Sequence, residues 1–334
     1  MRVAVLMLNL GGPANLGEVT PFLRNLFRDR EIIRFPGGSL GQRFFAWWIS
    51  RRKAAESARN YAAIGGGSPL LRWTRAQGDA MKRLVELETG LEIRPLPCMR
   101  YWYPFADEAL REAVDGGAEH IVAFTQYPHD SMTTTGGSLR EVRRVAARLG
   151  LRVPMTAITS WHDHPSYIAA LADCVREGVG RVPFEFRPGA RVVYSAHSLP
   201  MKFVDAGDPY PGQIRETAAL VHAEAGLLQH YEIAWQSKAG PVRWLAPSSI
   251  ERIRALPAEG VRDVVVVPIS FVNDHIETLQ ELDIALAEEA RRAGMRTFVR
   301  APGLNLRAPF VRALADVLVA HLRAQGVLEP VPSR

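Results

Sequence analysis

The sequence predicts an α/β protein made of two similar doubly wound, Rossmann-like parallel-sheet domains with a cleft between them. Short apolar runs rich in β-branched residues alternate with helical patterns from end to end, which is typical of parallel sheets covered by helices. The chain has 334 residues, a length that suits two domains. The runs form two groups that meet near Thr159, and no close repeat relates them, so we expect a similarity of architecture only.

Each predicted strand is a short apolar run that ends at polar residues, glycine or proline. The strands are predicted at 3–8, 92–96, 121–124 and 153–158 in the first group and at 192–194, 232–235, 264–267 and 297–299 in the second. Apolar residues at every third or fourth position predict helices at 104–115, 139–149, 167–177, 277–293 and 309–322.

These elements predict an N-terminal α/β domain at 1–158 and a C-terminal α/β domain at 159–306, with a last helix in 307–334 that docks back on the first domain. One segment, 35–53, interrupts the alternation because it brings four aromatic residues into five positions, which one helix face cannot hold. They are Phe44, Phe45, Trp47 and Trp48.

This aromatic segment has two interpretations. It packs into the core as an insertion, or it forms an apolar lip that contacts a flat hydrophobic ligand or a bilayer surface. The basic cluster Arg51, Arg52 and Lys53 follows the aromatic residues directly, and it suits an anionic small molecule or a membrane surface.

Composition excludes several classes of protein. The formal net charge of +6 is spread along the chain rather than gathered in one stripe, which argues against a nucleic-acid partner. Two cysteines, Cys98 and Cys174, rule out a disulfide scaffold, a four-cysteine zinc site and an all-cysteine iron–sulfur cluster, and they indicate a cytoplasmic protein. The apolar run 3–8 is too short for a secretory signal, and no run approaches the ~20 residues of a membrane helix.

Ligands of doubly wound sheets bind beyond the carboxyl ends of the strands. Glycine motifs occur there, but 11–13 lacks the spacing of a dinucleotide fingerprint and 65–69 lacks the lysine of a phosphate loop, so a nucleotide is disfavoured. Polar, aromatic and ionisable residues also gather there and predict a single large site between the domains. They lie at 9–13, 99–102, 125–129, 161–164, 195–200, 236–241 and 270–277.

A histidine and an acidic cluster are the most informative of these residues. His197 follows the fifth strand and is a candidate base, unless the backbone satisfies its ring. Asp274, Glu277 and Glu281 are expected on one helix face, which faces either solvent or a cation, whereas His275 is expected to point elsewhere. An imidazole and a carboxylate together bind a divalent metal with an open coordination sphere and take protons near neutral pH.

Two long motifs carry a family resemblance. Residues 195–200 read Ser-Ala-His-Ser-Leu-Pro and are followed by Gly-Asp-Pro-Tyr at 207–210, and residues 268–283 contain Phe-Val-Asn-Asp-His-Ile-Glu-Thr-Leu. Over roughly residues 3–306 the chain resembles the ferrochelatase family, and its Asn-Leu-Gly-Gly-Pro start resembles the protoporphyrin-using branch. Shorter matches lie at 8–13, 64–69 and 236–244.

The resemblance implies a chelatase-type fold and insertion of Fe(II) into protoporphyrin IX to form protohaem, the last step of haem biosynthesis. It implies that His197 takes the pyrrole protons or meets the metal, and that Glu277 faces it across the macrocycle from the opposite lobe. Both are therefore candidate catalytic and metal-binding residues. A polar line is implied to run from Glu277 through Asp274, His275 and Glu281.

The resemblance also implies the walls of a porphyrin pocket. Arg100 and Tyr101 match the metal-side wall, and Leu10 and Trp244 match its apolar and aromatic walls. Three further positions match the propionate end: Tyr61, Ser68 and Ser237.

Other functions stay open at this point. A chelatase of the same fold acts on coproporphyrin III, another tetrapyrrole or another metal, whereas a non-catalytic porphyrin or haem carrier needs the pocket but neither proton acceptor. The presence of both His197 and Glu277 favours the enzyme. The expected partners are the porphyrin and ferrous iron, with no permanently bound cofactor, no iron–sulfur cluster, and peripheral contact with the inner membrane through the lip. The sequence predicts no oligomeric state.

Overall fold

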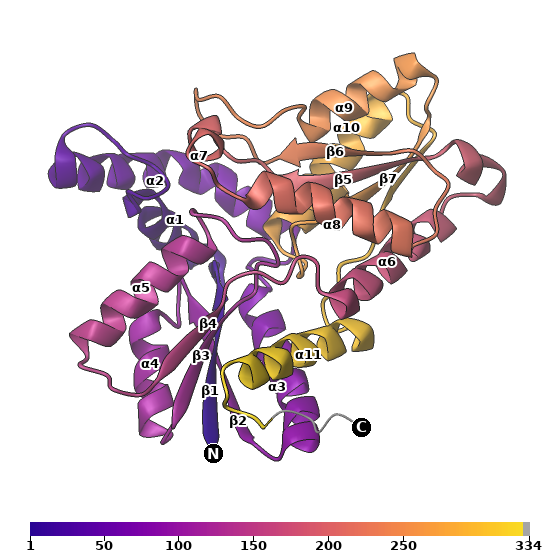
Figure 1. Ribbon diagram of the computed structural model, residues 1–334. Helices are drawn as coiled ribbons and strands as arrows, with labels where there is room; N and C mark the ends of the chain where they lie inside the picture. Colours follow the sequence, from indigo (N-terminus) through magenta and orange to yellow (C-terminus); the bar gives the residue numbers. More distant parts are fainter. Residues whose placement is uncertain (330–334) are drawn as a thin grey trace. The chain divides into compact units, whose positions relative to one another are not determined.

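The computed structural model describes residues 1–329 and divides the chain into two units, each built on a four-stranded parallel sheet (Figure 1). Within the described residues, unit 1 comprises 1–126, 132–159 and 315–329, and unit 2 comprises 127–131 and 160–314. The predicted domains, 1–158 and 159–306, differ from these units in two ways. Residues 127–131 belong to unit 2 rather than unit 1, and the last helix is divided between the two units.

The central strand of unit 1 is β1, whose residues 3–8 are all buried, as expected for a parallel strand covered on both faces. The strand order is β2-β1-β3-β4, and Val3 pairs with Ile93 on one side and with His120 on the other. The strands are β1 (Arg2–Asn9), β2 (Glu92–Met99), β3 (His120–Thr125) and β4 (Met155–Ile158).

Helices cover both faces of this sheet. On one face, Leu110 and Val142 join Leu6 in a buried apolar cluster. On the other, the third helix packs on β2 at Gly78, where an added Cβ would lie 2.8 Å from the Pro95 side chain. The helices are α3 (Leu70–Thr89), α4 (Ala106–Asp115) and α5 (Thr135–Arg148).

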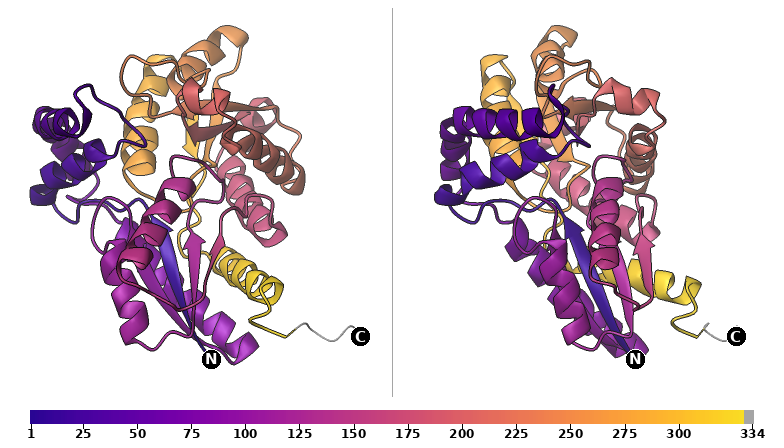
Figure 2. Two further views of the ribbon diagram at one scale, coloured as in Figure 1. Left: turned by 60° about the vertical axis from the view of Figure 1, so that its left-hand side comes forward. Right: turned by 90° about the vertical axis from the view of Figure 1, so that its left-hand side faces the viewer.

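A pair of helices in unit 1 contains the aromatic segment predicted at 35–53. A short turn, η1 (Leu16–Glu18), leads into α1 (Val19–Arg28), which packs side by side with the 26-residue α2 (Gly38–Ala63) (Figure 2). Three aromatic side chains of α2 are exposed, and a pure core insertion is therefore wrong. They are Phe44, Trp47 and Trp48, exposed by 57%, 39% and 41%.

Unit 2 repeats the topology of unit 1, with strand order β6-β5-β7-β8. Val193, Val264 and Val266 form one core with Leu282 and Leu286. The strands are β5 (Arg191–His197), β6 (Tyr231–Gln236), β7 (Asp263–Pro268) and β8 (Thr297–Arg300). The helices are α6 (Pro165–Gly180), η2 (Phe184–Gly189), α7 (Met201–Asp205), α8 (Tyr210–Glu224), α9 (Ser249–Ala255), η3 (Leu256–Glu259), η4 (Ile276–Leu286) and α10 (Ala287–Arg292).

Two helices differ from simple expectations. The helix predicted at 277–293 begins as an 11-residue π-helix, η4, and becomes α-helical only in α10. The last helix, α11 (Ala308–Ala324), belongs to unit 2 up to Leu314 and to unit 1 from Ala315. In its second half, His321 Nε2 lies 2.9 Å from Thr156 Oγ1 of β4.

Candidate active site

His197 is the last residue of β5, and neighbouring polar groups hold its backbone on both sides. Its amide donates to Ser270 Oγ at 3.0 Å, and its carbonyl accepts from the Tyr210 hydroxyl at 3.0 Å. The side chain is 43% exposed, and its Nδ1 lies 2.6 Å from Oε2 of Glu277. Within residues 1–329 the other ring nitrogen, Nε2, makes no hydrogen bond. That nitrogen is therefore free to meet a substrate.

Glu277 lies in the first turn of η4, and its side chain is only 15% exposed. Besides His197, its carboxylate accepts a hydrogen bond from Ser237 Oγ at 3.1 Å and lies 3.8 Å from Nε2 of His275. Its backbone carbonyl accepts from Gln236 Nε2 at 2.9 Å. Residues at the carboxyl ends of β5 and β6 thus contact Glu277, which follows β7 in the chain.

A second carboxylate, that of Glu281, shares these contacts. Ser237 Oγ lies 2.6 Å from Glu281 Oε2, and Gln236 Nε2 donates to the same oxygen at 3.2 Å. One hydroxyl has one hydrogen to donate, so Ser237 can serve Glu277 and Glu281 at once only if a carboxyl proton of Glu281 donates back to it. Two acidic groups and one hydroxyl therefore form a short path for a proton.

The pKa values of these three groups move in directions that follow from their contacts. Burial lowers the pKa of His197, but the Glu277 carboxylate outweighs it and raises that pKa above its ordinary value. Burial raises the pKa of Glu277, but the charge and hydrogen bond of His197 outweigh it and leave the Glu277 pKa strongly lowered. Burial and the neighbouring Glu277 charge raise the pKa of Glu281. The contacts thus move the pKa values of the two carboxyl groups in opposite directions, down at Glu277 and up at Glu281.

Comparisons with known proteins give the family of the chain. The ferrochelatase family model matches residues 2–322. A ferrochelatase of Picosynechococcus sp. is 43% identical over 325 residues, covering 96% of this chain and 83% of that protein. A ferrochelatase of Geotalea daltonii is 42% identical over 325 residues, covering 97% and 99%.

The chain belongs to the ferrochelatase family. Members of this family are lyases that insert iron into a porphyrin in haem biosynthesis.

Solved structures confirm the chelatase fold. SirB from Bacillus subtilis with Fe3+ matches with a TM-score of 0.57 over 98% of this chain and 99% of that one, at 12% identity. SirB from Bacillus subtilis subspecies spizizenii in complex with cobalt matches with a TM-score of 0.51 over the same shares.

Two expectations drawn from the ferrochelatase resemblance are wrong in geometry. His197 and Glu277 do not come from opposite lobes, because both belong to unit 2. At 2.6 Å they also leave no room for a macrocycle between them. The carboxylate is instead a direct hydrogen-bond partner of the imidazole.

The acidic line differs from the prediction as well. Asp274 is turned away from Glu277, because its carboxylate pairs with Arg300 at 2.9 Å and accepts from Asn305 Nδ2 at 2.7 Å. It precedes η4, so the helical spacing rule does not apply to it. His275, expected to point elsewhere, instead reaches Glu277 because its backbone is extended, with φ −159° and ψ −166°.

Two further candidates of unit 2 lie near this cluster in sequence. Ser237 lies between the two carboxylates, in a left-handed conformation with φ +64°, and its predicted contact with a propionate stays a prediction. Trp244 pairs with Pro200 in an isolated antiparallel bridge, and its indole Nε1 is buried without a hydrogen-bond partner in the described residues.

Three candidates of unit 1 lie at or near the two glycine loops, residues 11–13 and 65–69. Leu10 is half-buried directly after β1, and Tyr61 is 5% exposed near the end of α2. The Ser68 amide donates to the Pro13 carbonyl at 2.7 Å, and a Cβ at Gly12 would lie 2.5 Å from Ser68 Oγ. The two glycine loops therefore pack against each other, which explains why Gly12 carries no side chain.

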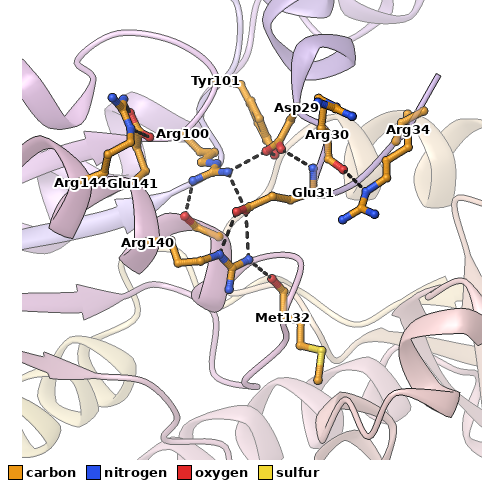
Figure 3. A network of polar contacts seen from close by, with 12 residues as sticks. Asp29, Arg30, Glu31, Arg34, Arg100, Tyr101, Met132, Arg140, Glu141 and Arg144 are labelled. Atoms are coloured by element: carbon orange, nitrogen blue, oxygen red, sulfur yellow. Dashed lines mark hydrogen bonds and ion pairs between the residues drawn. The ribbon is translucent and has the colours of Figure 1, made fainter. Parts of the chain in front are cut away.

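Arg100 and Tyr101 belong to a buried ion-pair network that sequence reasoning missed (Figure 3). Arg100 pairs with Asp29 at 2.8 Å and with Glu31 at 3.0 Å, and it donates to the Gly137 carbonyl. The Tyr101 hydroxyl donates to Asp29 at 2.7 Å. Burial raises the pKa of Asp29, but the hydrogen bonds from Arg100 and Tyr101 outweigh it and lower that pKa. Asp29 and Glu31 follow α1 in an irregular segment, where no periodicity predicts a partner.

One group of side chains in unit 2 has ligand atoms spaced for a metal ion. Atoms of His162, Asp163 and Glu216 lie within 4.8 Å of one another, and both carboxylates are exposed. The His162 ring already has partners, with Ser160 Oγ at 2.8 Å from Nδ1 and Glu216 Oε2 at 3.0 Å from Nε2. Sequence reasoning placed residues 161–164 after a strand but gave no signal for Glu216.

Proposed function

We propose that the protein inserts Fe(II) into protoporphyrin IX to form protohaem, with His197 as the base and Glu277 as its partner. Family membership gives the coarser activity, insertion of iron into a porphyrin by a lyase of haem biosynthesis. The observation that carries the residue assignment is the 2.6 Å contact between His197 Nδ1 and Glu277, which leaves Nε2 without a partner in the described chain.

The contact sets which ring nitrogen does the chemistry. A Glu277 carboxylate accepts the Nδ1 hydrogen and so fixes the tautomer in which Nε2 carries the lone pair. Nε2 then accepts a proton from a pyrrole N–H, and Glu277 stabilises the imidazolium that forms. Because the Glu277 pKa is strongly lowered, the carboxylate keeps its charge while the imidazole gains and loses protons.

Two protons leave a free-base porphyrin as iron enters, so the base must release the first proton before it takes the second. Since Nε2 takes that proton, Nε2 must also release it, and the 43% exposure of the His197 side chain lets the proton leave to solvent while Glu277 keeps the Nδ1 hydrogen in place. Burial and the Glu277 charge raise the pKa of Glu281, which makes this carboxyl group a weaker acid than Glu277.

The same atoms suit Fe(II) as a passing substrate. An imidazole nitrogen and a carboxylate oxygen are adequate ligands for a divalent iron ion, and so few ligands leave its coordination sphere open. Neither cysteine belongs to this cluster, so no thiolate retains the ion.

An anaerobic assay tests the proposal. Purified protein is incubated with Fe(II) and either protoporphyrin IX or coproporphyrin III, and the visible spectrum shows which macrocycle is metalated. We expect metalation of protoporphyrin IX and its loss in His197→Ala. Preference for coproporphyrin III would overturn the substrate, and a fully active His197→Ala variant would overturn the base.

We propose that the enzyme contains no iron–sulfur cluster. The chain has only two cysteines, one in β2 and one in α6. Burial raises the pKa of Cys98 to about 12 and that of Cys174 to about 11, so both thiols stay protonated, and a thiol ligates iron as the thiolate. An assay for acid-labile sulfide in freshly purified protein should give none, and a stoichiometric amount would contradict the proposal.

We further propose a peripheral contact between α2 and the cytoplasmic face of the inner membrane. No helix in the described chain is long and apolar enough to cross a bilayer. The exposed Trp47 and Trp48 each lie under an arginine, with the Arg51 and Arg52 guanidinium carbons 4.7 Å from their rings. Aromatic rings with cations beside them are typical of surfaces that rest at a headgroup layer.

A further inference from the structure

A hollow of about 460 Å³ lies between the end of α1 and the first turns of α2 in unit 1. Three of its five lining residues are arginines, and none is acidic. Its volume falls within the ~300–1,000 Å³ typical of small-molecule sites. We call it the arginine pocket. It is lined by Arg28, Arg30, Ser39, Gln42 and Arg43.

The three guanidinium groups of this pocket have no ion pair or side-chain hydrogen bond within residues 1–329. The neighbouring acids are occupied, because Asp29 pairs with Arg100 and Glu31 pairs with Arg100 and Arg140 (Figure 3). Arg30 takes part in that network only through its carbonyl, which accepts from Arg34 Nε. The pocket therefore concentrates positive charge that the protein itself does not neutralise, and such charges repel one another unless an anion binds.

Gln42 holds the two sides of the arginine pocket together. It is 2% exposed, and its amide nitrogen donates to the Phe27 carbonyl at 2.8 Å and to the Ile33 carbonyl at 2.9 Å. Its amide oxygen accepts from the Phe35 amide at 3.0 Å. These three bonds fix the segment that carries Arg28 and Arg30 to the helix that carries Arg43. The pocket is thus formed without a ligand.

The first turn of α2 adds to the positive field. Gly37 caps this helix in a left-handed conformation with φ +84°, and Ser39 lies in the first turn beside the pocket. The free amides at the start of a 26-residue helix carry a partial positive charge that favours oxyanions. The hydroxyl, the amides and the guanidinium groups are all donors, so a ligand must be rich in acceptors.

We propose that the arginine pocket binds the phosphate group of a phosphate ester. Three guanidinium groups match the several oxygens and the near-double charge of phosphate better than the two oxygens of a carboxylate. The volume exceeds the need of a free inorganic ion and leaves room for the esterified group. This proposal does not depend on the proposed metal insertion, because it uses none of the residues around His197; only its lipid source rests on the proposed membrane contact of α2.

Two sources supply such an ester, a soluble metabolite or the headgroup of an anionic phospholipid. The surface beside Arg43 favours the headgroup, since Leu40 and Phe44 are 78% and 57% exposed on the same helix. Glycerol 3-phosphate represents the soluble source in calorimetric titration. Sedimentation with phosphatidylcholine vesicles, with and without phosphatidylglycerol, represents the lipid source.

The test variant is Arg30→Gln/Arg43→Gln, and the matched control is Arg143→Gln/Arg152→Gln, which removes the same charge from exposed, unpaired arginines elsewhere in unit 1. Because the arginines of the pocket have no protein partner, the test variant should fold, which a thermal melt checks. Whichever probe the wild type binds, glycerol 3-phosphate or phosphatidylglycerol vesicles, we expect Arg30→Gln/Arg43→Gln to bind it at least about tenfold more weakly. The control variant should bind that probe as tightly as wild type.

Binding of glycerol 3-phosphate identifies a soluble ester, and binding of phosphatidylglycerol vesicles alone identifies a headgroup. The proposal fails if wild type binds neither probe or if the test and control variants lose affinity equally. It also fails if Arg30→Gln/Arg43→Gln raises the porphyrin KM without changing binding of either probe, since the pocket would then serve the carboxylates of the substrate.

Discussion

Unit 1 and unit 2 each hold a network of charged side chains beyond the ends of equivalent strands, and the two networks differ in their charge balance. In unit 1, Arg100 and Arg140 face Asp29 and Glu31, two cations for two anions. In unit 2, the Glu277 carboxylate contacts the imidazoles of His197 and His275, and a second carboxylate, that of Glu281, lies beside it through Ser237. In the balanced network the partners lower the pKa of Asp29 and raise that of Arg100, so the carboxylate stays negative and the guanidinium stays positive. The unbalanced one drives the pKa values of Glu277 and Glu281 in opposite directions, which marks an acid–base site.

The largest expected effect comes from removing the imidazole. His197→Ala should lower kcat for metal insertion by about 10²- to 10⁴-fold, because the free Nε2 is the proposed proton acceptor. Porphyrin binding, measured by fluorescence quenching, should stay within a few-fold of wild type. The control is His230→Ala, which removes an exposed histidine. A kcat close to that of wild type would place the base elsewhere.

Removing the carboxylate should change the pH dependence of the reaction. In wild type, kcat/KM should rise with pH through an apparent pKa above 6.5, since protonated His197 can neither accept a proton nor bind iron. In Glu277→Gln the imidazole loses its main partner, and only the smaller effect of Glu281 opposes burial, so the rise should move to lower pH while the maximal rate falls. A pH profile unchanged in the variant would show that this pair does not limit the reaction.

The balanced network should affect stability rather than chemistry. Arg100→Met leaves the Asp29 carboxylate, which is 9% exposed, without its cation and should lower the free energy of unfolding by about 3–5 kcal/mol. Arg144→Met removes an exposed pair with Glu141 and should cost at most about 1 kcal/mol. Denaturant unfolding measures both. An Arg100→Met protein with normal stability but a large drop in kcat would instead assign Arg100 to the substrate.

The smallest effect is expected at the exposed aromatic residues of α2. Phe44→Ser/Trp47→Ser/Trp48→Ser should weaken sedimentation with anionic vesicles and leave kcat for soluble porphyrin within about twofold, because none of the three belongs to the hydrogen-bonded network of His197. Leu228→Ser, at a residue that is 98% exposed, is the control. Unchanged vesicle binding would make these side chains merely structural.

Much of the fold could be predicted from the sequence, because each strand is an apolar run that ends at a polar residue or proline. The same runs placed His197 and Glu277 near one sheet edge, since the carboxyl ends of parallel strands share that edge. The partnership of these two residues was not predictable, because spacing along the chain does not say whether two loops meet directly or across a ligand. Asp274 was misplaced for a similar reason, since its partner Arg300 lies in β8.

The left-handed backbone of Ser237 has a consequence for how this position can evolve. A side chain at φ +64° costs of order 1 kcal/mol that glycine would avoid, yet glycine has no hydroxyl to place between Glu277 and Glu281. Glycine at position 237 would therefore relax the backbone and at the same time break the link between the two carboxylates. The conformational cost at this turn is the cost of holding that hydroxyl in place.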